Sequence, residues 1–467
     1  MLLLLMPAVA FGATGVTINK TNFSDATFRS FVGKFDTNKD NILSATELNA
    51  VKKIDVSFMN IKSLKGVEKF PNLTYLDASY NSLSALDVSN NTKLTTLYCD
   101  GNSIETLNIA ANTALTKLAC TDNCLLSLNV TKNTKLTFLS CGDNRLTSLN
   151  VKYNTALKTL YCFDNYLKAL NLTANTALTE LSCGDNSELT ALDLGKNTAL
   201  KSLTCESAGL TALDVSKNAA LEYLCCNGNR LTALNVSANT ALEILACSNN
   251  KLTSLITGSN TALCDVSCEN NSLTKLNVTG NTGLIALYCS GNKLTALDVS
   301  KNAALDCLQC DRNGLTTLNL TKNTALMDLN CTKNNLSKLN IRYTKLLHNS
   351  GDYAYMGCQK DGESIVVNMT AAQKKIYQEA AYAVSNDGVI VAVDGVISMA
   401  SPTITGLTNT ANGITVKWSK VAGADGYRIY RSGDGGASYV RAITIRSGST
   451  VSYADAHATE SGRTYIY

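Results

Sequence analysis

The chain has 467 residues, of which 41 are lysine or arginine and 37 are aspartate or glutamate, giving a formal net charge of +4. This length suffices for about three ordinary domains or for one long repeat array, and the near balance of charge gives no electrostatic basis for binding nucleic acid. The chain also holds 17 cysteines and only 3 prolines. Many cysteines in an exported protein first suggest a disulfide scaffold, so their spacing has to decide between bridges and another role.

Residues 1–12 are predicted to be a signal peptide. The run from Met1 to Phe11 is apolar, and Ala10-Phe11-Gly12 has the small-x-small form of a cleavage site. Because no lysine or arginine precedes the run, we expect a start further upstream or an atypical signal, with a buried N-terminal strand as the alternative. No later segment approaches the ~20 apolar residues that a transmembrane helix needs.

Residues 13–53 are predicted to form a helical cap with a calcium-binding loop. Aromatic and aliphatic residues recur at helical spacing between Phe28 and Phe35, after Ser24, which we expect to be the N-cap. The next residues resemble an EF-hand loop, although Asn41 stands where that motif has glycine. The predicted ligands of a structural calcium ion are Asp36, Asn38, Asp40, the carbonyl of Ile42, Ser44 and Glu47. In the alternative without a metal, Ser44 and Glu47 form a capping box for a second helix.

A repeat fills residues 54–343. Each unit follows the pattern Leu94-x-x-Leu97-x-Cys99-x-x-Asn102-x-Ile104, which matches the leucine-rich repeat. The unit has 21 residues and recurs about 14 times, and one step, between Cys183 and Cys205, has 22. The alternation around each cysteine predicts a strand, and a weaker second strand is expected in the other half of the unit. We therefore expect a mainly β leucine-rich-repeat solenoid of 21-residue coils, with a parallel sheet and few helices.

Twelve cysteines form one column at this period, at 99, 120, 141, 162, 183, 205, 226, 247, 268, 289, 310 and 331. Their position points inward, so we interpret them as reduced core thiols, with a ladder of disulfides or metals as the alternative. Cys225 and Cys307 fall at outward strand positions and are expected to be the more reactive thiols. Asparagine columns mark the bends, where their amides can bond the turn backbone. Ala208 interrupts one column, so a weaker bend is expected there.

The chain changes character after the repeats. Residues 344–400 are predicted to cover the end of the solenoid, with a helix from Thr370 to Ala383 and a strand from Val389 to Val393. Residues 401–467 contain short alternating strands, and Trp418 followed by Gly426-Tyr427-x-x-Tyr430 resembles a fibronectin type III domain, an immunoglobulin-like β-sandwich. Tyr465 would be its tyrosine-corner residue. The sequence covers about 67 residues of a fold that needs about 100, so we expect a partial domain and a longer parent protein.

Outward positions of the main sheet are the candidate binding surface. Aromatic residues there bind proteins and also stack on sugars, although β-propensity alone is an alternative explanation for them. Four of them, Tyr98, Phe138, Tyr161 and Phe163, are expected to form one cluster. The predicted ligand-binding residues are Tyr75, Tyr98, Asp100, Phe138, Tyr161, Phe163, Glu180, Glu206, Tyr223, Asp265, Glu269 and Tyr288.

Taken together, these segments resemble the internalin-like leucine-rich-repeat surface proteins of bacteria. The resemblance implies a secreted or cell-surface adhesion module that binds a host or cell-surface protein or glycan, without naming the ligand. It also implies attachment to a membrane only through an anchor outside this sequence, and we expect a monomer. The alternative is the non-catalytic targeting part of a larger secreted enzyme that degrades glycans or peptides.

Catalysis within this chain is not expected. The two histidines, His348 and His457, lie in different regions and neither is near a nucleophile motif. Asp265 and Glu269 are the nearest approach to a paired-carboxylate site. They are expected on an open face with nothing to perturb their ionisation.

Overall fold

The computed structural model describes residues 15–346 and, beyond them, residues 356–357, 365–370, 372–373, 390–392, 396–398, 403–410, 413–419, 427–432, 439–445 and 450–455. The predicted signal peptide, both histidines and Tyr465 lie outside these residues, as does most of the predicted helix from Thr370 to Ala383. The chain divides into two compact units, Met1–Leu200 and Lys201–Tyr467. No helix of the described residues is long and apolar enough to cross a membrane.

The first unit begins with the cap. Strands β1 (Val16–Thr17) and β2 (Ile42–Leu43) pair antiparallel, and between and after them lie α1 (Ala26–Val32), the 3-10 helix η1 (Gly33–Phe35) and α2 (Ala45–Ala50). The N-cap of α1 is Asp25, so the prediction of Ser24 is wrong. One Asp25 oxygen accepts the N–H groups of Thr27 and Phe28, and the other accepts the Lys62 N–H at 2.9 Å. A carboxylate has two oxygens, so one residue can cap the helix and also hold the first coil.

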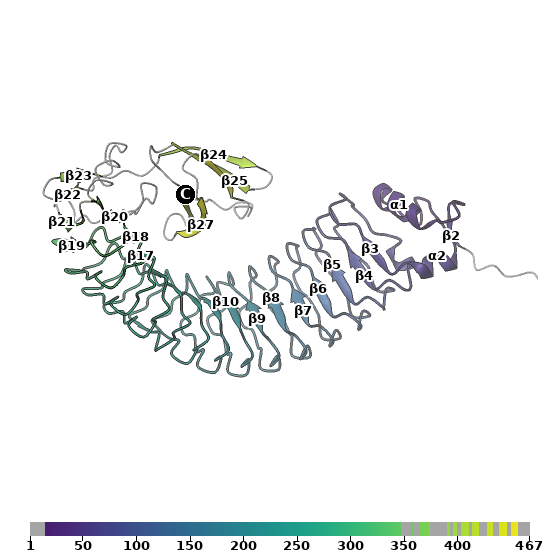
Figure 1. Cartoon of the computed structure of the whole chain (residues 1–467). Helices are drawn as coiled ribbons and strands as arrows, with labels where there is room; N and C mark the ends of the chain where they lie inside the picture. The colour runs from purple at the N-terminus through teal and green to yellow at the C-terminus, as the bar shows by residue number, and fades with distance from the viewer. Residues whose placement is uncertain are drawn as a thin grey trace, which may run out of the picture. The chain divides into compact units, whose positions relative to one another are not determined.

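The repeats of the first unit form a parallel sheet in register (Figure 1). A short 3-10 helix, η2 (Val67–Lys69), lies between its first two strands. The central leucine of each strand from β4 onward is at most 1% exposed, and it pairs with its equivalents in the neighbouring strands. The strands are β3 (Lys53–Asp55), β4 (Tyr75–Asp77), β5 (Thr96–Tyr98), β6 (Lys117–Ala119), β7 (Phe138–Ser140), β8 (Thr159–Tyr161) and β9 (Glu180–Ser182).

The second unit continues the same pattern of parallel strands. Its main strands are β10 (Ser202–Thr204), β11 (Tyr223–Cys225), β13 (Ile244–Ala246), β15 (Asp265–Ser267), β16 (Ala286–Tyr288), β17 (Cys307–Gln309), β18 (Asp328–Asn330) and β20 (Met356–Gly357). The predicted second strand of the repeat forms at β12 (Ala233–Asn235) and β14 (Ser254–Ile256), which pair in parallel, and as an isolated bridge between Asn277 and Asp298. The solenoid fold class is therefore confirmed.

A mixed sheet and two antiparallel sheets follow the repeats. Strand β19 (Lys338–Asn340) pairs with β21 (Ile365–Asn368), which pairs with β22 (Ile390–Ala392), and β23 (Val396–Ser398) completes this sheet. A three-stranded sheet of β24 (Ile404–Thr410), β25 (Gly413–Trp418) and β28 (Ser452–Asp455) accompanies the pair β26 (Tyr427–Arg431) and β27 (Val440–Ile445). Trp418, Tyr427 and Ile429 share a small core. A C-terminal β region is thus present, and its assignment as fibronectin type III stays a prediction.

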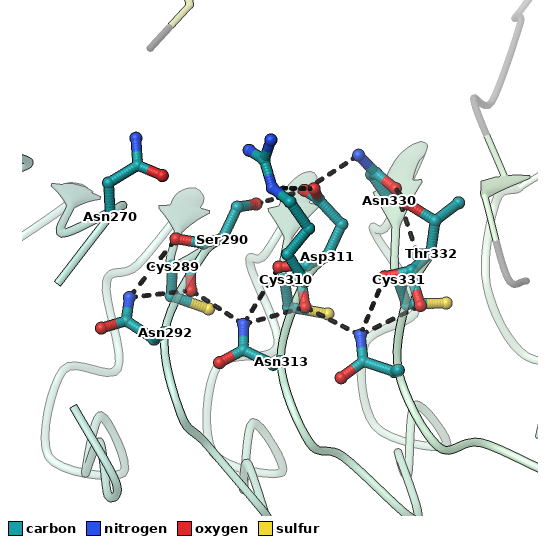
Figure 2. Close-up of polar contacts among 12 residues, drawn as sticks. Asn270, Cys289, Ser290, Asn292, Cys310, Asp311, Asn313, Asn330, Cys331 and Thr332 are labelled. Atoms are coloured by element: carbon teal, nitrogen blue, oxygen red, sulfur yellow. Dashed lines mark hydrogen bonds and ion pairs between the residues drawn. The ribbon is translucent and has the colours of Figure 1, made fainter. Parts of the chain in front are cut away.

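The cysteine column lies in the core, as predicted. Its members are at most 1% exposed and, among the described residues, all the cysteines are free thiols. From Asn123 onward, the asparagines of the adjacent column bond the cysteine carbonyls of two coils. Figure 2 shows this for Asn313, whose Nδ2 donates to the carbonyls of Cys289 (3.0 Å) and Cys310 (3.1 Å). Its Oδ1 accepts the Leu294 N–H at 3.0 Å. These side-chain bonds satisfy backbone groups at the bend that have no partner in the β-sheet ladder.

The asparagine column is interrupted at Ala208, and the 22-residue coil makes a backbone hydrogen bond in place of the missing side-chain one. Elsewhere the leucine N–H after the bend donates to an asparagine of the next coil, as Leu167 does to Asn186 at 2.9 Å. In the 22-residue coil, Leu189 instead donates to the carbonyl of Asn186 at 2.8 Å. The residue inserted between Asn186 and Leu189 makes this turn, so this N–H is paired without the asparagine that Ala208 replaces.

Candidate functional site: the outward face of the parallel sheet

The outward side chains of the first unit fall into columns fixed by strand register. One column runs from Lys53 through Tyr75, Thr96, Lys117, Phe138 and Thr159 to Glu180, and the next from Asp55 through Asp77, Tyr98, Ala119, Ser140 and Tyr161 to Ser182. The twelve predicted ligand-binding residues are all partly exposed, and their role in binding stays a prediction. Two residues of the first column are basic, Lys53 and Lys117. Lys53 was not predicted to lie on this face.

The aromatic residues of this face form two pairs and not one cluster. Tyr75 and Tyr98 meet edge to face with ring centroids 5.9 Å apart, and Phe138 and Tyr161 do so at 5.8 Å. Ala119 and Ser140 occupy the register positions between Tyr98 and Tyr161, so small side chains separate the pairs. The predicted single cluster is therefore wrong, because adjacent strands carry aromatic residues at different register positions.

Polar groups modify each pair. The Lys53 ammonium lies 4.6 Å from the centroid of the Tyr75 ring. Burial, together with the neighbouring Glu180, raises the pKa of Tyr161 to about 12, so its hydroxyl stays protonated and can donate a hydrogen bond. Burial also raises the pKa of Asp100, which accepts the Thr121 N–H at 2.8 Å.

The position of a further aromatic residue, Phe163, depends on a glycine. The ring of Phe163 lies over Gly142, where a Cβ atom would come within 2.7 Å of the ring. A residue with a side chain at position 142 would therefore displace Phe163. The second unit has no equivalent aromatic pair among its described ring contacts on this face, and Tyr223 and Tyr288 stand among acids and polar side chains there.

The outward cysteines of the second unit are covered, so the prediction that they are reactive is wrong. Cys225 is 5% exposed, and its thiol donates to Glu206 Oε2 at 3.6 Å. Burial and then Glu206 raise its pKa to about 12, which suppresses the thiolate. Cys307 is 3% exposed. The in–out alternation of strand residues correctly predicts which way these side chains point. It does not predict which residues cover them, because those residues come from neighbouring coils.

The acids of the second unit are not all unperturbed, contrary to expectation. Burial raises the pKa of Asp265 to about 6. The Glu269 N–H donates to the Ser248 hydroxyl at 3.0 Å. A raised carboxyl pKa accompanies many catalytic sites but also many structural ones.

A polar network that the sequence analysis did not find joins three coils of the second unit (Figure 2). Asp311 is 8% exposed and accepts the Ser290 hydroxyl and the Asn330 amide, the latter at 3.0 Å. Arg312 Nε lies 3.1 Å from its other oxygen. Both oxygens of the Asp311 carboxylate thus have protein partners, which favours a structural tie between coils over a site for a ligand.

Hydrogen bonds among its own residues order the predicted calcium loop. Asn41 has φ +63°, the left-handed conformation usually taken by glycine, and its N–H donates to Asp36 Oδ2 at 2.8 Å. The capping box of Ser44 and Glu47 also forms. Glu47 Oε1 accepts the N–H and hydroxyl of Thr37, and hydrogen bonds from Thr37 and Ser44 lower the pKa of Glu47 to about 2.

The loop's fit to calcium is therefore partial. Asp36, Asn38, Asp40 and Ser44 offer side-chain oxygens and Ile42 its carbonyl, but both Glu47 oxygens already accept hydrogen bonds. No group of three or more acidic, histidine or cysteine side chains suited to a metal ion occurs in the described part of the chain. For Glu47 to bind calcium, it would have to give up hydrogen bonds that it accepts from Thr37 and Ser44.

These features define a leucine-rich-repeat solenoid with a thiol column in its core. Among solved structures, the chain is similar to the functional domain of InlJ from Listeria monocytogenes, which includes a cysteine ladder, with 27% identity, a TM-score of 0.70, and coverage of 95% of this chain and 93% of that one. It is also similar in fold to the internalin InlF of Listeria monocytogenes (21% identity, TM-score 0.56, covering 70% and 94%). The leucine-rich effector YopM of Yersinia pestis matches as well (20% identity, TM-score 0.50, covering 74% and 94%). In fold, then, this is an internalin-like leucine-rich-repeat protein. No protein-family model and no curated protein sequence matches the chain.

Proposed function

We propose that this chain is a non-enzymatic binding module, exported by bacteria, that holds a protein ligand on the outward sheet face between β5 and β9. The observation that carries the proposal is the pair of Phe138 and Tyr161, flanked by Phe163. Half-exposed aromatic side chains on a rigid sheet supply large contact area at low entropic cost, and such residues dominate measured binding energies.

The ring geometry favours a protein over a glycan at this face. The two pairs meet at interplanar angles of 83° and 86°, so they do not form one flat platform. They present ring edges and hydroxyl groups on either side of Ala119 and Ser140. Small residues between aromatic ridges suit interdigitation with the side chains of a protein partner, while Asp100 and Glu180 supply acceptors around them.

The proposal is tested with a Tyr161→Ala/Phe163→Ala double variant. Proteins that bind the wild-type chain on a protein array are measured again by surface plasmon resonance. We expect affinity to fall at least about thirtyfold, the effect of removing a hot spot of about 2 kcal/mol, with unchanged circular dichroism. Tyr153→Ala, a change at an exposed bend residue outside this face, is the matched control and should bind normally. Equal binding by the double variant would refute the proposal.

We also propose that the loop Asp36–Glu47 binds calcium to stiffen the cap. The left-handed Asn41 and its bond to Asp36 support this proposal, since they preserve the loop shape that the motif obtains from glycine. The ion would complete a cover over the first coil, whose core is otherwise closed by Phe23, Phe28 and Phe70.

A further inference from the structure

A second surface feature lies beside the outward face, at the bend that follows each strand. One residue in nearly every coil takes a left-handed backbone there, with φ between +47° and +66°. Side chains other than glycine, asparagine and aspartate are disfavoured in this conformation. The column consists of Phe58, Tyr80, Gly101, Asp122, Asp143, Asp164, Asp185, Ser207, Gly228, Asn249, Asn270, Gly291, Arg312 and Lys333.

Ser207, Arg312 and Lys333 also depart from this preference, but Phe58 and Tyr80 are the aromatic residues of the column. Both are bulky aromatic residues in a strained conformation, with φ +58° and +54°. Neither gains the usual compensation of burial, because Phe58 is 71% and Tyr80 51% exposed. Strain that the core does not need marks a position held for another purpose.

The two rings form an ordered stack. Their centroids lie 4.4 Å apart with planes inclined by 13°, and the backbone beneath is tied by the Phe58 N–H to the Ser79 carbonyl at 3.0 Å. Tyr80 in turn lies over Gly101, where a Cβ atom would approach the ring to 2.5 Å. With one ring face against Tyr80 and most of its surface exposed, Phe58 leaves its other face open to solvent.

Acceptor groups precede the stacked rings along the chain in a repeated pattern. Asp55-Val56-Ser57-Phe58 and Asp77-Ala78-Ser79-Tyr80 share the order Asp-x-Ser-aromatic in adjacent coils. Asp55 and Asp77 pair in sheet register. Each aspartate accepts a bond from its own serine, the Ser57 hydroxyl at 3.0 Å and the Ser79 N–H at 3.0 Å. The aromatic stack and two adjacent carboxylates thus come from the same short segments.

We propose that Phe58 and Tyr80, with Asp55 and Asp77, form a binding site for a neutral saccharide, separate from the protein-binding face. A sugar ring offers weakly positive C–H groups to the negative face of an aromatic ring, and its hydroxyls donate to carboxylates. Lys53 Nζ lies 3.3 Å from Asp55 Oδ2, so the charge that disfavours phosphate, uronate and sialate groups is chiefly that of Asp77, because like charges repel. The flat stack differs in this respect from the edge-to-face pairs on the sheet.

The test replaces the rings with residues that the column uses elsewhere. Because asparagine occurs there at 249 and 270, Phe58→Asn/Tyr80→Asn relieves strain and should keep or raise the thermal midpoint. The full chain is applied to an array of neutral gluco-, galacto- and N-acetylhexosamine oligosaccharides beside uronate and sialylated ones. The strongest neutral binder is then titrated by calorimetry into each variant.

We expect binding of neutral oligosaccharides that falls at least tenfold in the double variant. It should survive in Tyr166→Asn, a matched change at another exposed tyrosine, and in Tyr161→Ala/Phe163→Ala. The last control separates this site from the proposed protein-binding face, so either proposal can fail alone. A lack of neutral binders, a preference for acidic glycans, loss of only a protein partner, or a lowered thermal midpoint in the asparagine variant would overturn the assignment.

Discussion

Replacing Val130 with threonine tests how the second, fully buried asparagine column is satisfied. Asn154 donates through Nδ2 to the carbonyls of Val130 (3.0 Å) and Asn133 (2.8 Å), but no donor among the described residues reaches its Oδ1. Asn281 is different, because the Thr257 hydroxyl donates to its Oδ1 at 2.7 Å. Thr257 precedes Asn281 by 24 residues, as Val130 precedes Asn154. Val130→Thr should therefore give Asn154 the same donor.

The expected magnitude follows from two opposing terms. Burying a hydroxyl without a partner costs about 1–3 kcal/mol, and a hydrogen bond to an otherwise unpaired buried acceptor returns about 0.5–1.5 kcal/mol. Val130 and Val266 are both 0% exposed, but Val266 lies in strand β15 and not at the asparagine bend. We expect the control Val266→Thr to cost about 1–3 kcal/mol and Val130→Thr to cost about 1 kcal/mol less than the control.

The assay is denaturant unfolding of the full chain, completed as a double-mutant cycle with Asn154→Ala. Removing the amide alone deprives two carbonyls of a donor and should cost about 1–3 kcal/mol. In the Asn154→Ala background, Val130→Thr should cost about as much as Val266→Thr does in the wild type. The coupling energy between positions 130 and 154 should therefore be about 1 kcal/mol. If Val130→Thr costs as much as Val266→Thr and shows no coupling, the oxygen already has a partner and the reasoning is refuted.

Three further predictions follow from the core, the second unit and the cap. Burial raises the pKa of Cys141 to about 12, so a thiol reagent at pH 8 should label partly exposed Cys264 well before the column, which reacts on unfolding; comparable rates would contradict this. The native pKa of Asp265, about 6, exceeds its ordinary 3.8, so stability falls as pH rises from about 4 to 6. Asp265→Asn should therefore stabilise the chain by about 1–3 kcal/mol at pH 7 and have little effect at pH 4, as measured by urea unfolding. Millimolar calcium should raise the thermal midpoint of the wild type but not of Asp36→Ala, and no rise in either would reject the calcium site.

The period of the sequence predicts most of this fold, because each coil repeats one set of contacts. The spacing of Cys99 and its equivalents fixes which side chains point inward, and register then fixes the neighbours of each outward residue. Local pattern does not settle choices that depend on another coil. Ser24 and Asp25 are both good N-caps, and Asp25 is used because its second oxygen meets Lys62, 37 residues later.

The candidate sites are harder to predict for the same reason. Alternation correctly turns Cys225 outward, but Glu206 from the preceding coil covers its thiol. The edge-to-face pairs depend on which of two register columns each ring occupies, so listing outward aromatic residues overstates their clustering. The Asp-x-Ser-aromatic pattern ending at Phe58 and Tyr80 was visible in the sequence, yet its meaning rests on the left-handed backbone at those residues.

Residues that break the pattern of a repeat can be sorted by whether they gain a stabilising contact in exchange. Arg312 also breaks the preference of the left-handed column, but its Nε lies 3.1 Å from the nearly buried carboxylate of Asp311, which ties three coils together. Thr257 breaks the valine column and supplies a donor to Asn281. Phe58 and Tyr80 have only each other and Gly101 beneath them, with most of Phe58 in solvent. Replacement of those two rings should therefore keep or raise stability while removing a function.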